Sequence, residues 1–201
     1  MPSPSRPTWS ALKRSLSNRG QSELLALVKE LFELSADNRA FLAARFLAGE
    51  PHTDAAEGSV ATPYRQRIHD AFYDKGGWPR SNPRLADARK GIRDYRKATA
   101  DSAGTLELML TYVETGTDYS LDFGAEDASL FNSLSSVLSE IEAACSGQHG
   151  LALYDDFRER LLYLADRAGG IGWGYGDHVH SIIQGLEERW EDAGAPPRAG
   201  S

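Results

Sequence analysis

The sequence contains a single cysteine, Cys145, and this scarcity limits the chemistry open to the chain. One cysteine cannot form an internal disulfide, and a chain without disulfides suits a reducing cytoplasm. Cys145 falls at an apolar position of an expected helix, so we interpret it as a packing residue. We therefore expect a cytoplasmic protein that depends on an apolar core for its stability.

Long apolar runs and alternating strand patterns are also missing. No stretch of 18 apolar residues occurs, so no membrane span is expected. The N-terminal MPSPSRPTWS lacks the apolar core of a signal peptide. Because no alternating, β-branched run of strand length occurs either, the sequence favours helices over sheets.

Apolar residues recur at three- and four-residue steps along most of the chain, which predicts amphipathic helices. Capping residues, prolines and glycines mark their expected ends. We predict an all-α fold, an antiparallel bundle of about eight or nine helices, with a hairpin rhythm that loosely resembles helical repeats. The expected helices cover residues 9–17, 22–34, 35–49, 62–75, 82–99, 106–116, 126–146, 153–168 and 177–190.

These helices are expected to form one domain over residues 9–193. Residues 1–8 are predicted to be a disordered lead-in and residues 194–201 a disordered tail. The polar, patternless stretch EPHTDAAEG, at about residues 50–58, is predicted to be a mobile loop.

The stretch from residue 82 to residue 119 carries the clearest pattern of the chain. Asn82 and Pro83 resemble a helix start, and a strongly basic helix is expected after them. The next segment, residues 106–113, is apolar on most sides and is expected to be central, with Gly116 as its stop signal. The basic helix is the first candidate binding surface, formed by Arg89, Arg93, Arg96 and Lys97.

Charge is distributed unevenly along the chain. Residues 64–97 hold ten Lys or Arg against four Asp or Glu, a local charge of +6. Residues 101–196 hold four Arg, no Lys and eighteen acids, a local charge of −14. The two halves can neutralise each other within one fold, or the basic face can bind an acidic partner. Nucleic acid is a less favoured partner, because the chain as a whole is acidic and has no nucleic-acid-binding motif.

A second candidate site is the loop GGIGWGYG and the GDHVH segment that follows it. Glycines allow close approach of the backbone to a ligand, and Asp and His side chains can bind metals. The loop lacks the GxGxxG spacing and follows a helix, which argues against a dinucleotide site. Asp177 is also a good helix cap, in which case His178 and His180 point apart and cannot share a metal ion. The candidate residues of this loop are Trp173, Tyr175, Asp177 and His178.

Four segments, YRQRIHDAFY, NPRLADARKGIRDYRKA, LELMLTYVETGTDYSLDFG and GWGYGDHV, together resemble a family of small all-helical bacterial proteins of unknown function. The resemblance covers roughly residues 10–183. It implies a helical fold and a bacterial, cytoplasmic protein. Since the family carries no known activity, no functional residue can be transferred from it.

The sequence favours a non-catalytic module that binds a protein partner or itself through the basic helix face. No nucleophile elbow, zinc-protease helix motif or calcium loop is present, and neither a cofactor nor a metal is expected. The alternative is an enzyme that binds a metal or small ligand near residues 169–178. The surroundings of the loop distinguish the interaction module from the enzyme. Burial of Trp173 and Tyr175 in a dry core favours a packing role, whereas a pocket beside His178 favours the enzyme.

Overall fold

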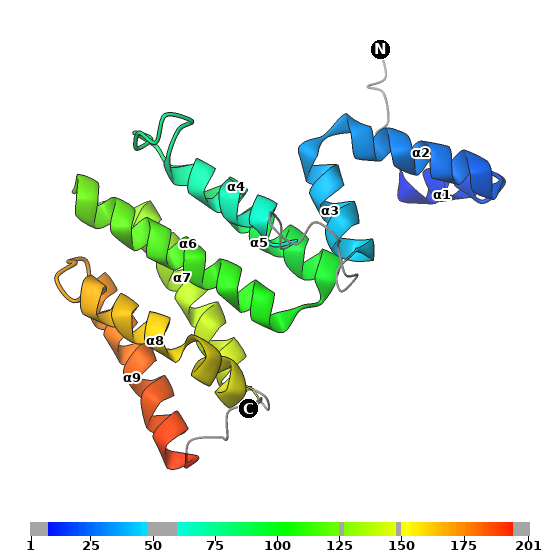
Figure 1. Ribbon diagram of the computed structural model, residues 1–201. Helices are drawn as coiled ribbons and strands as arrows, with labels where there is room; N and C mark the ends of the chain where they lie inside the picture. Colours follow the sequence, from blue (N-terminus) through cyan, green and yellow to red (C-terminus); the bar gives the residue numbers. More distant parts are fainter. Residues whose placement is uncertain (1–7, 48–59, 125–126, 148–149, 195–201) are drawn as a thin grey trace.

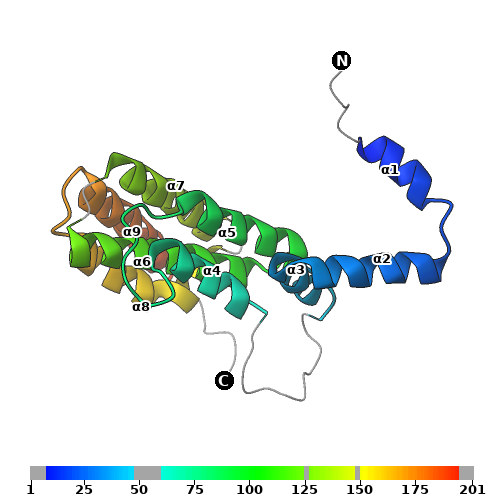
Figure 2. The same cartoon turned by 90° about the horizontal axis from the view of Figure 1, so that it is seen from above.

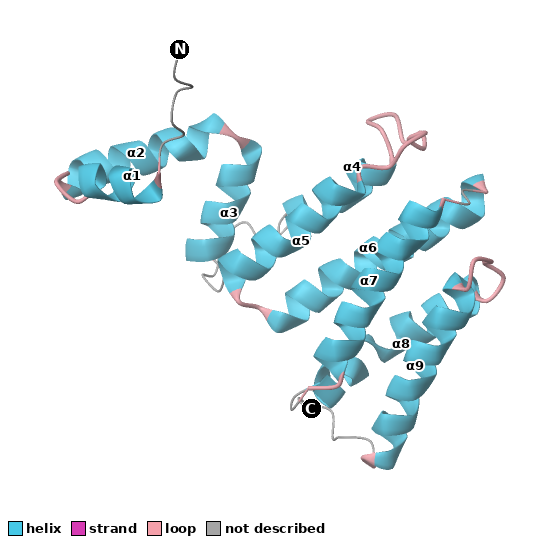
Figure 3. Ribbon diagram, turned by 180° about the vertical axis from the view of Figure 1, so that it is seen from behind, coloured by secondary structure: helices cyan, strands magenta, loops and turns pink. Residues whose placement is uncertain are grey.

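The computed structural model describes residues 8–47, 60–124, 127–147 and 150–194, and in these ranges it is all-α (Figures 1 and 3). The prediction of an all-α bundle is confirmed. The predicted lead-in (except Thr8), the loop at about residues 50–58 and all but the first residue of the tail lie outside the described residues. The helices of the described part are α1 (Trp9–Leu16), α2 (Gln21–Leu34), α3 (Ala36–Phe46), α4 (Thr62–Phe72), α5 (Leu85–Thr99), α6 (Ser102–Phe123), α7 (Ala128–Cys145), α8 (Gly150–Ala168) and α9 (Tyr175–Asp192).

Helix α6 occupies the centre of the bundle and packs against α4, α5, α7 and α8. Half of its residues are buried, as expected for a segment that is apolar on most sides. The pair α8 and α9 closes one side of the bundle, with α9 also packed on α7. One continuous core therefore runs from α4 to α9.

Gly116 does not end the central helix, contrary to the sequence prediction. Helix α6 continues to Phe123 and ends at Gly124, whose left-handed φ of 61° closes it. Gly116 is buried instead, and a Cβ there would lie 2.5 Å from Leu134 Cδ2 of α7. The glycine allows α6 and α7 to approach closely, so its role is in packing.

Two predicted helix starts were also misplaced. Asn82 does not cap α5, because Arg84 occupies the N-cap position and the helix begins at Leu85. Asp177 does not cap α9, which begins two residues earlier with Gly174 at the N-cap. Asp177 lies in the first turn, where an acidic side chain is favoured by the helix dipole.

Helices α1 and α2 form an N-terminal arm that extends away from the bundle (Figure 2). Neither helix contains a buried residue. The arm is attached through α3, which packs against α5 and has a single buried residue, Ala44. Figure 2 shows α1 turning away from α2, so the apolar stripes of the two helices are not packed together.

The acidic and basic halves of the sequence neutralise each other in part. Ion pairs join Arg65 of the basic segment to Glu107 at 2.8 Å and Arg96 of the same segment to Glu140 at 3.0 Å. Within the acidic part, Arg160 pairs with Glu114 at 2.6 Å and Arg167 with Asp118 at 2.7 Å. The charge polarity of the sequence therefore serves, in part, to hold neighbouring helices of one bundle together.

A partly buried three-residue contact joins α8 to α9. Arg158 Nε lies 2.9 Å and 3.0 Å from the two carboxylate oxygens of Glu187, and the hydroxyl of the buried Tyr154 donates to the same carboxylate at 2.5 Å. The hydrogen bonds from Arg158 lower the pKa of Glu187, and Tyr154 acts in the same direction against partial burial. The ionised form is thus favoured in the folded protein.

This lowered pKa makes a prediction about acid stability. A carboxyl whose pKa is lower in the folded state stabilises the fold above its unfolded pKa of 4.5 and loses that contribution as the pH falls through the folded value. The difference in Tm between the wild type and Glu187→Gln should be widest near neutral pH and narrow below about pH 4.5. Calorimetry over a pH series measures it. A difference that is constant with pH would contradict the assignment.

Candidate functional site

The predicted basic face lies on α5, and the structure divides its members into two groups. Arg89 and Arg96 each bind Glu140 of α7, at 3.4 Å and 3.0 Å. Arg93 and Lys97 are exposed and have no hydrogen bond or ion pair to any described residue. Two of the four residues are therefore engaged in ion pairs that link α5 to α7, and the other two carry charge that no described residue compensates.

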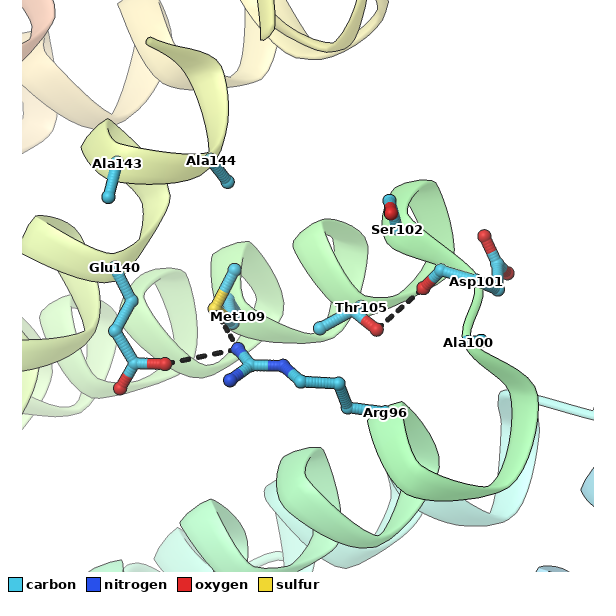
Figure 4. Close-up of a pocket in the computed structure, with 9 residues that line it drawn as sticks. All are labelled: Arg96, Ala100, Asp101, Ser102, Thr105, Met109, Glu140, Ala143 and Ala144. Atoms are coloured by element: carbon cyan, nitrogen blue, oxygen red, sulfur yellow. Dashed lines mark hydrogen bonds and ion pairs between the residues drawn. The ribbon is translucent and has the colours of Figure 1, made fainter. Parts of the chain in front are cut away.

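Arg89 and Arg96 are held by further contacts besides Glu140. Arg89 donates to Ser136 Oγ at 3.2 Å, and Arg96 donates to Met109 Sδ at 3.3 Å. Figure 4 shows Arg96 reaching from α5 towards Met109 and Glu140 along one side of a cavity. Both guanidinium groups are thus fixed by partners on α6 or α7.

Two cavities adjoin the ion pair between Arg96 and Glu140. The larger, of about 360 Å³, lies between the α5–α6 connection and α7, and its walls include Ala143 and Ala144 (Figure 4). The smaller, of about 150 Å³, is lined by Arg89, Arg93, Arg96 and Glu140 together with Ile92, Met109 and Val137. Arg96, Met109 and Glu140 line both cavities.

Other arginines that could have extended the basic face are engaged elsewhere. Arg67 pairs with Asp37 at 3.1 Å and lies 3.8 Å from Asp94. Arg80 and Arg84 both donate to the backbone carbonyl of Asp70 at 2.8 Å. These side chains hold α3, α4 and the α4–α5 connection in place, and they do not contribute free charge to the basic face.

The glycine loop places its four candidate residues in different environments. Tyr175 is only 1% exposed, stacks on Phe131 at 5.2 Å between ring centroids, and shares a 2.7 Å hydrogen bond with Thr117. Burial raises the pKa of its phenol. Trp173, in contrast, is 66% exposed, and its φ is 60°. The two aromatic residues therefore do not form one surface.

Asp177 is exposed and His178 is half-buried, and neither lines any of the cavities described above. Among the described residues, no group of three or more His, Cys, Asp or Glu side chains could hold a metal ion. His149, which could have completed a site, lies outside the described residues. The loop thus supplies a packing residue in Tyr175 and an exposed indole in Trp173, and neither residue lines the two cavities beside the basic face.

The N-terminal arm exposes many large apolar side chains, whereas its helices were predicted to be part of the bundle. Leu25 and Leu34 are 62% and 76% exposed. The signal in the sequence was the width of the apolar arc on α2. At 100° per residue, the apolar residues of this helix cover about half of its circumference. The exposed large apolar residues of the arm are Trp9, Leu12, Leu24, Leu25, Val28, Leu31, Phe32 and Leu34.

Comparison with protein-family models, with curated proteins and with solved structures finds no match for this chain. The resemblance to small helical bacterial proteins therefore stays a prediction. Among the residues that the structure describes, no helix is long and apolar enough to cross a membrane.

Proposed function

We propose that the protein is a non-catalytic interaction module that self-associates through its N-terminal arm. The observation that carries the proposal is that α1 and α2 bury no residue, although their apolar side chains lie on one side of each helix. An isolated amphipathic helix of this length is marginal in water, because most helical stability in proteins comes from packing of the apolar face. The arm requires a partner surface to cover that face.

The size of this apolar surface fits a protein interface. Its eight large side chains, at their observed exposures, present on the order of 800 Å² if a fully exposed large side chain contributes about 200 Å². A standard interface takes about 800 Å² from each partner. Isolated monomers rarely expose an apolar patch above a few hundred Å².

Charge favours a second copy of the chain as the occupant. Helix α1 carries Lys13 and Arg14 and no acid, and neither side chain has an ion-pair partner among the described residues. Helix α2 is acidic, with Glu23, Glu30 and Glu33 against Lys29. When two arms pair about a two-fold axis, α1 of each copy can lie against α2 of the other, with opposite charges facing.

A reducing cytoplasm is the compartment that we propose for this module. Its support is Cys145, the only cysteine of the chain, which is buried in the core. Burial raises the pKa of its thiol to about 11, so the thiol stays protonated and unreactive at neutral pH.

The test is the mass of the full chain in solution. Val28 and Leu31 lie at the centre of the apolar arc, and replacing both by Glu should raise the dissociation constant of the assembly about 100-fold or more, because each removes about 1.5 kcal/mol or more of burial. Sedimentation equilibrium up to about 100 μM measures it. Circular dichroism checks that the helical content is retained.

Ala26→Glu is the control for an added glutamate, because it places one such charge on the polar side of α2. It should leave the dissociation constant within about twofold of the wild-type value. A wild-type chain that stays monomeric up to about 100 μM contradicts self-association. An Ala26→Glu variant that dissociates as readily as the double variant contradicts the apolar arc as the contact.

A further inference from the structure

The side chains that line the smaller cavity carry more positive charge than the neighbouring acidic side chain neutralises. Three arginines, Arg89, Arg93 and Arg96, line it together with one carboxylate, Glu140. The formal charge of these four side chains is +2. The charge is gathered on one side of one helix, where like charges at three- and four-residue spacing repel each other.

Arg93 is the residue on which the excess charge is concentrated. The two oxygens of Glu140 are already bonded to Arg89 and Arg96, and Arg93 has no partner among the described residues. A guanidinium group has five N–H donors, so Arg89 and Arg96 also retain donors that Glu140 does not use. An oxyanion in the cavity would find unused donors on all three arginines.

Two of the three arginines are held in place before any ligand arrives. Arg89 donates to Ser136 of α7, and Arg96 donates to Met109 of α6. Glu140 orients both guanidinium groups, and the side chain of Arg89 is only 31% exposed. Donors that are already ordered lose less conformational entropy on binding, which favours affinity.

We propose that Arg93, with Arg89 and Arg96, binds the phosphate group of a small molecule in this cavity. Several features point to phosphate. A phosphate group offers enough oxygens to bond more than one guanidinium at once, and arginine forks match that geometry. A cavity of about 150 Å³ accommodates one such group. The adjoining cavity of about 360 Å³, with its alanine wall, can accept an organic substituent on the phosphate.

In this arrangement Glu140 competes with the ligand for Arg89 and Arg96. Its carboxylate keeps the two guanidinium groups in place in the free protein and lowers the positive charge that the ligand meets. The site is independent of the N-terminal arm, since no residue of α1 or α2 lines either cavity.

Calorimetric titration of the full chain with inorganic phosphate, at constant ionic strength in chloride, tests the proposal. Arg93→Ala should weaken binding at least tenfold and leave Tm nearly unchanged, because the exposed Arg93 makes no hydrogen bond or ion pair with any described residue. Glu140→Gln should tighten binding several-fold, because it removes the competing charge. Lys97→Ala is the control, since Lys97 lies one turn from Arg93 and lines neither cavity.

Phenyl phosphate distinguishes the two sources of the phosphate group. Tighter binding of phenyl phosphate than of inorganic phosphate supports a phosphate ester that uses both cavities, and equal binding supports free phosphate. Absence of binding heat from both ligands overturns the proposal. So does an Arg93→Ala variant that binds within twofold of the wild type, or a Glu140→Gln variant that binds more weakly.

Discussion

Replacing Tyr175 by Ala is expected to lower the free energy of unfolding by about 3–5 kcal/mol, the range for removing a large buried aromatic side chain. Tyr175 is almost completely buried, stacks on Phe131 of α7 and shares a hydrogen bond with Thr117 of α6. The substitution therefore leaves a cavity at the junction of α6, α7 and α9. Chemical denaturation of the two proteins measures the difference.

Two controls separate the parts of this effect. Tyr175→Phe keeps the ring and removes only the hydroxyl, so it should cost about 1 kcal/mol. Thr117 remains satisfied in that variant through its 2.8 Å hydrogen bond to the carbonyl of Val113. Trp173→Ala, at an exposed position two residues away, should change stability by less than about 0.5 kcal/mol. A Tyr175→Ala variant as stable as the wild type would contradict the packing role.

The fold class could be predicted because it depends on local periodicity. Leu134, Leu138 and Leu161 belong to the apolar repeats of the helices predicted over residues 126–146 and 153–168, and the structure places all three in the core. Helix ends were harder to predict, because the same residue types serve more than one purpose. Gly116 has the sequence signature of a stop, but it packs against Leu134, which is distant in the sequence.

The candidate surfaces show the same limit. Helical spacing placed Arg89, Arg93 and Arg96 near each other, and this was sufficient to identify a basic face. It could not show that Glu140, 44 residues beyond Arg96 in the chain, binds two of the three arginines and leaves Arg93 free. An ion pair between distant segments depends on tertiary packing, which periodicity does not encode.

The N-terminal arm shows what an apolar pattern leaves open. A wide apolar arc on α2 indicates that the helix is covered, but it does not say by what. Residues 22–34 were expected to belong to one helical domain with the rest of the chain. In the structure α2 does contact α3, yet its large apolar residues remain exposed. This exposure is the observation from which we propose a contact between chains.

Replacing Gly176 by Ala is expected to lower the free energy of unfolding by about 2–3 kcal/mol, as overpacking of a close contact does. Gly176 is buried in the first turn of α9, and an added Cβ would lie 2.5 Å from the carbonyl oxygen of Ala168 and 3.0 Å from that of Ile171. Both are backbone atoms, the first of the last residue of α8 and the second of the α8–α9 connection. Neither can move aside as a side chain can, so α8 and α9 would have to separate.

Gly172→Ala is the matched control, since it is the same substitution in the same loop. No atom lies within 4 Å of a Cβ built at Gly172, and the residue is exposed. Because alanine restricts the unfolded chain more than glycine does, this variant should be as stable as the wild type or more stable by up to about 1 kcal/mol. Opposite signs for the two variants, measured by chemical denaturation, would show that Gly176 is required by the close approach of α8 and α9. A Gly176→Ala variant as stable as the wild type would contradict that contact. The glycine loop would then again be a candidate ligand-binding element.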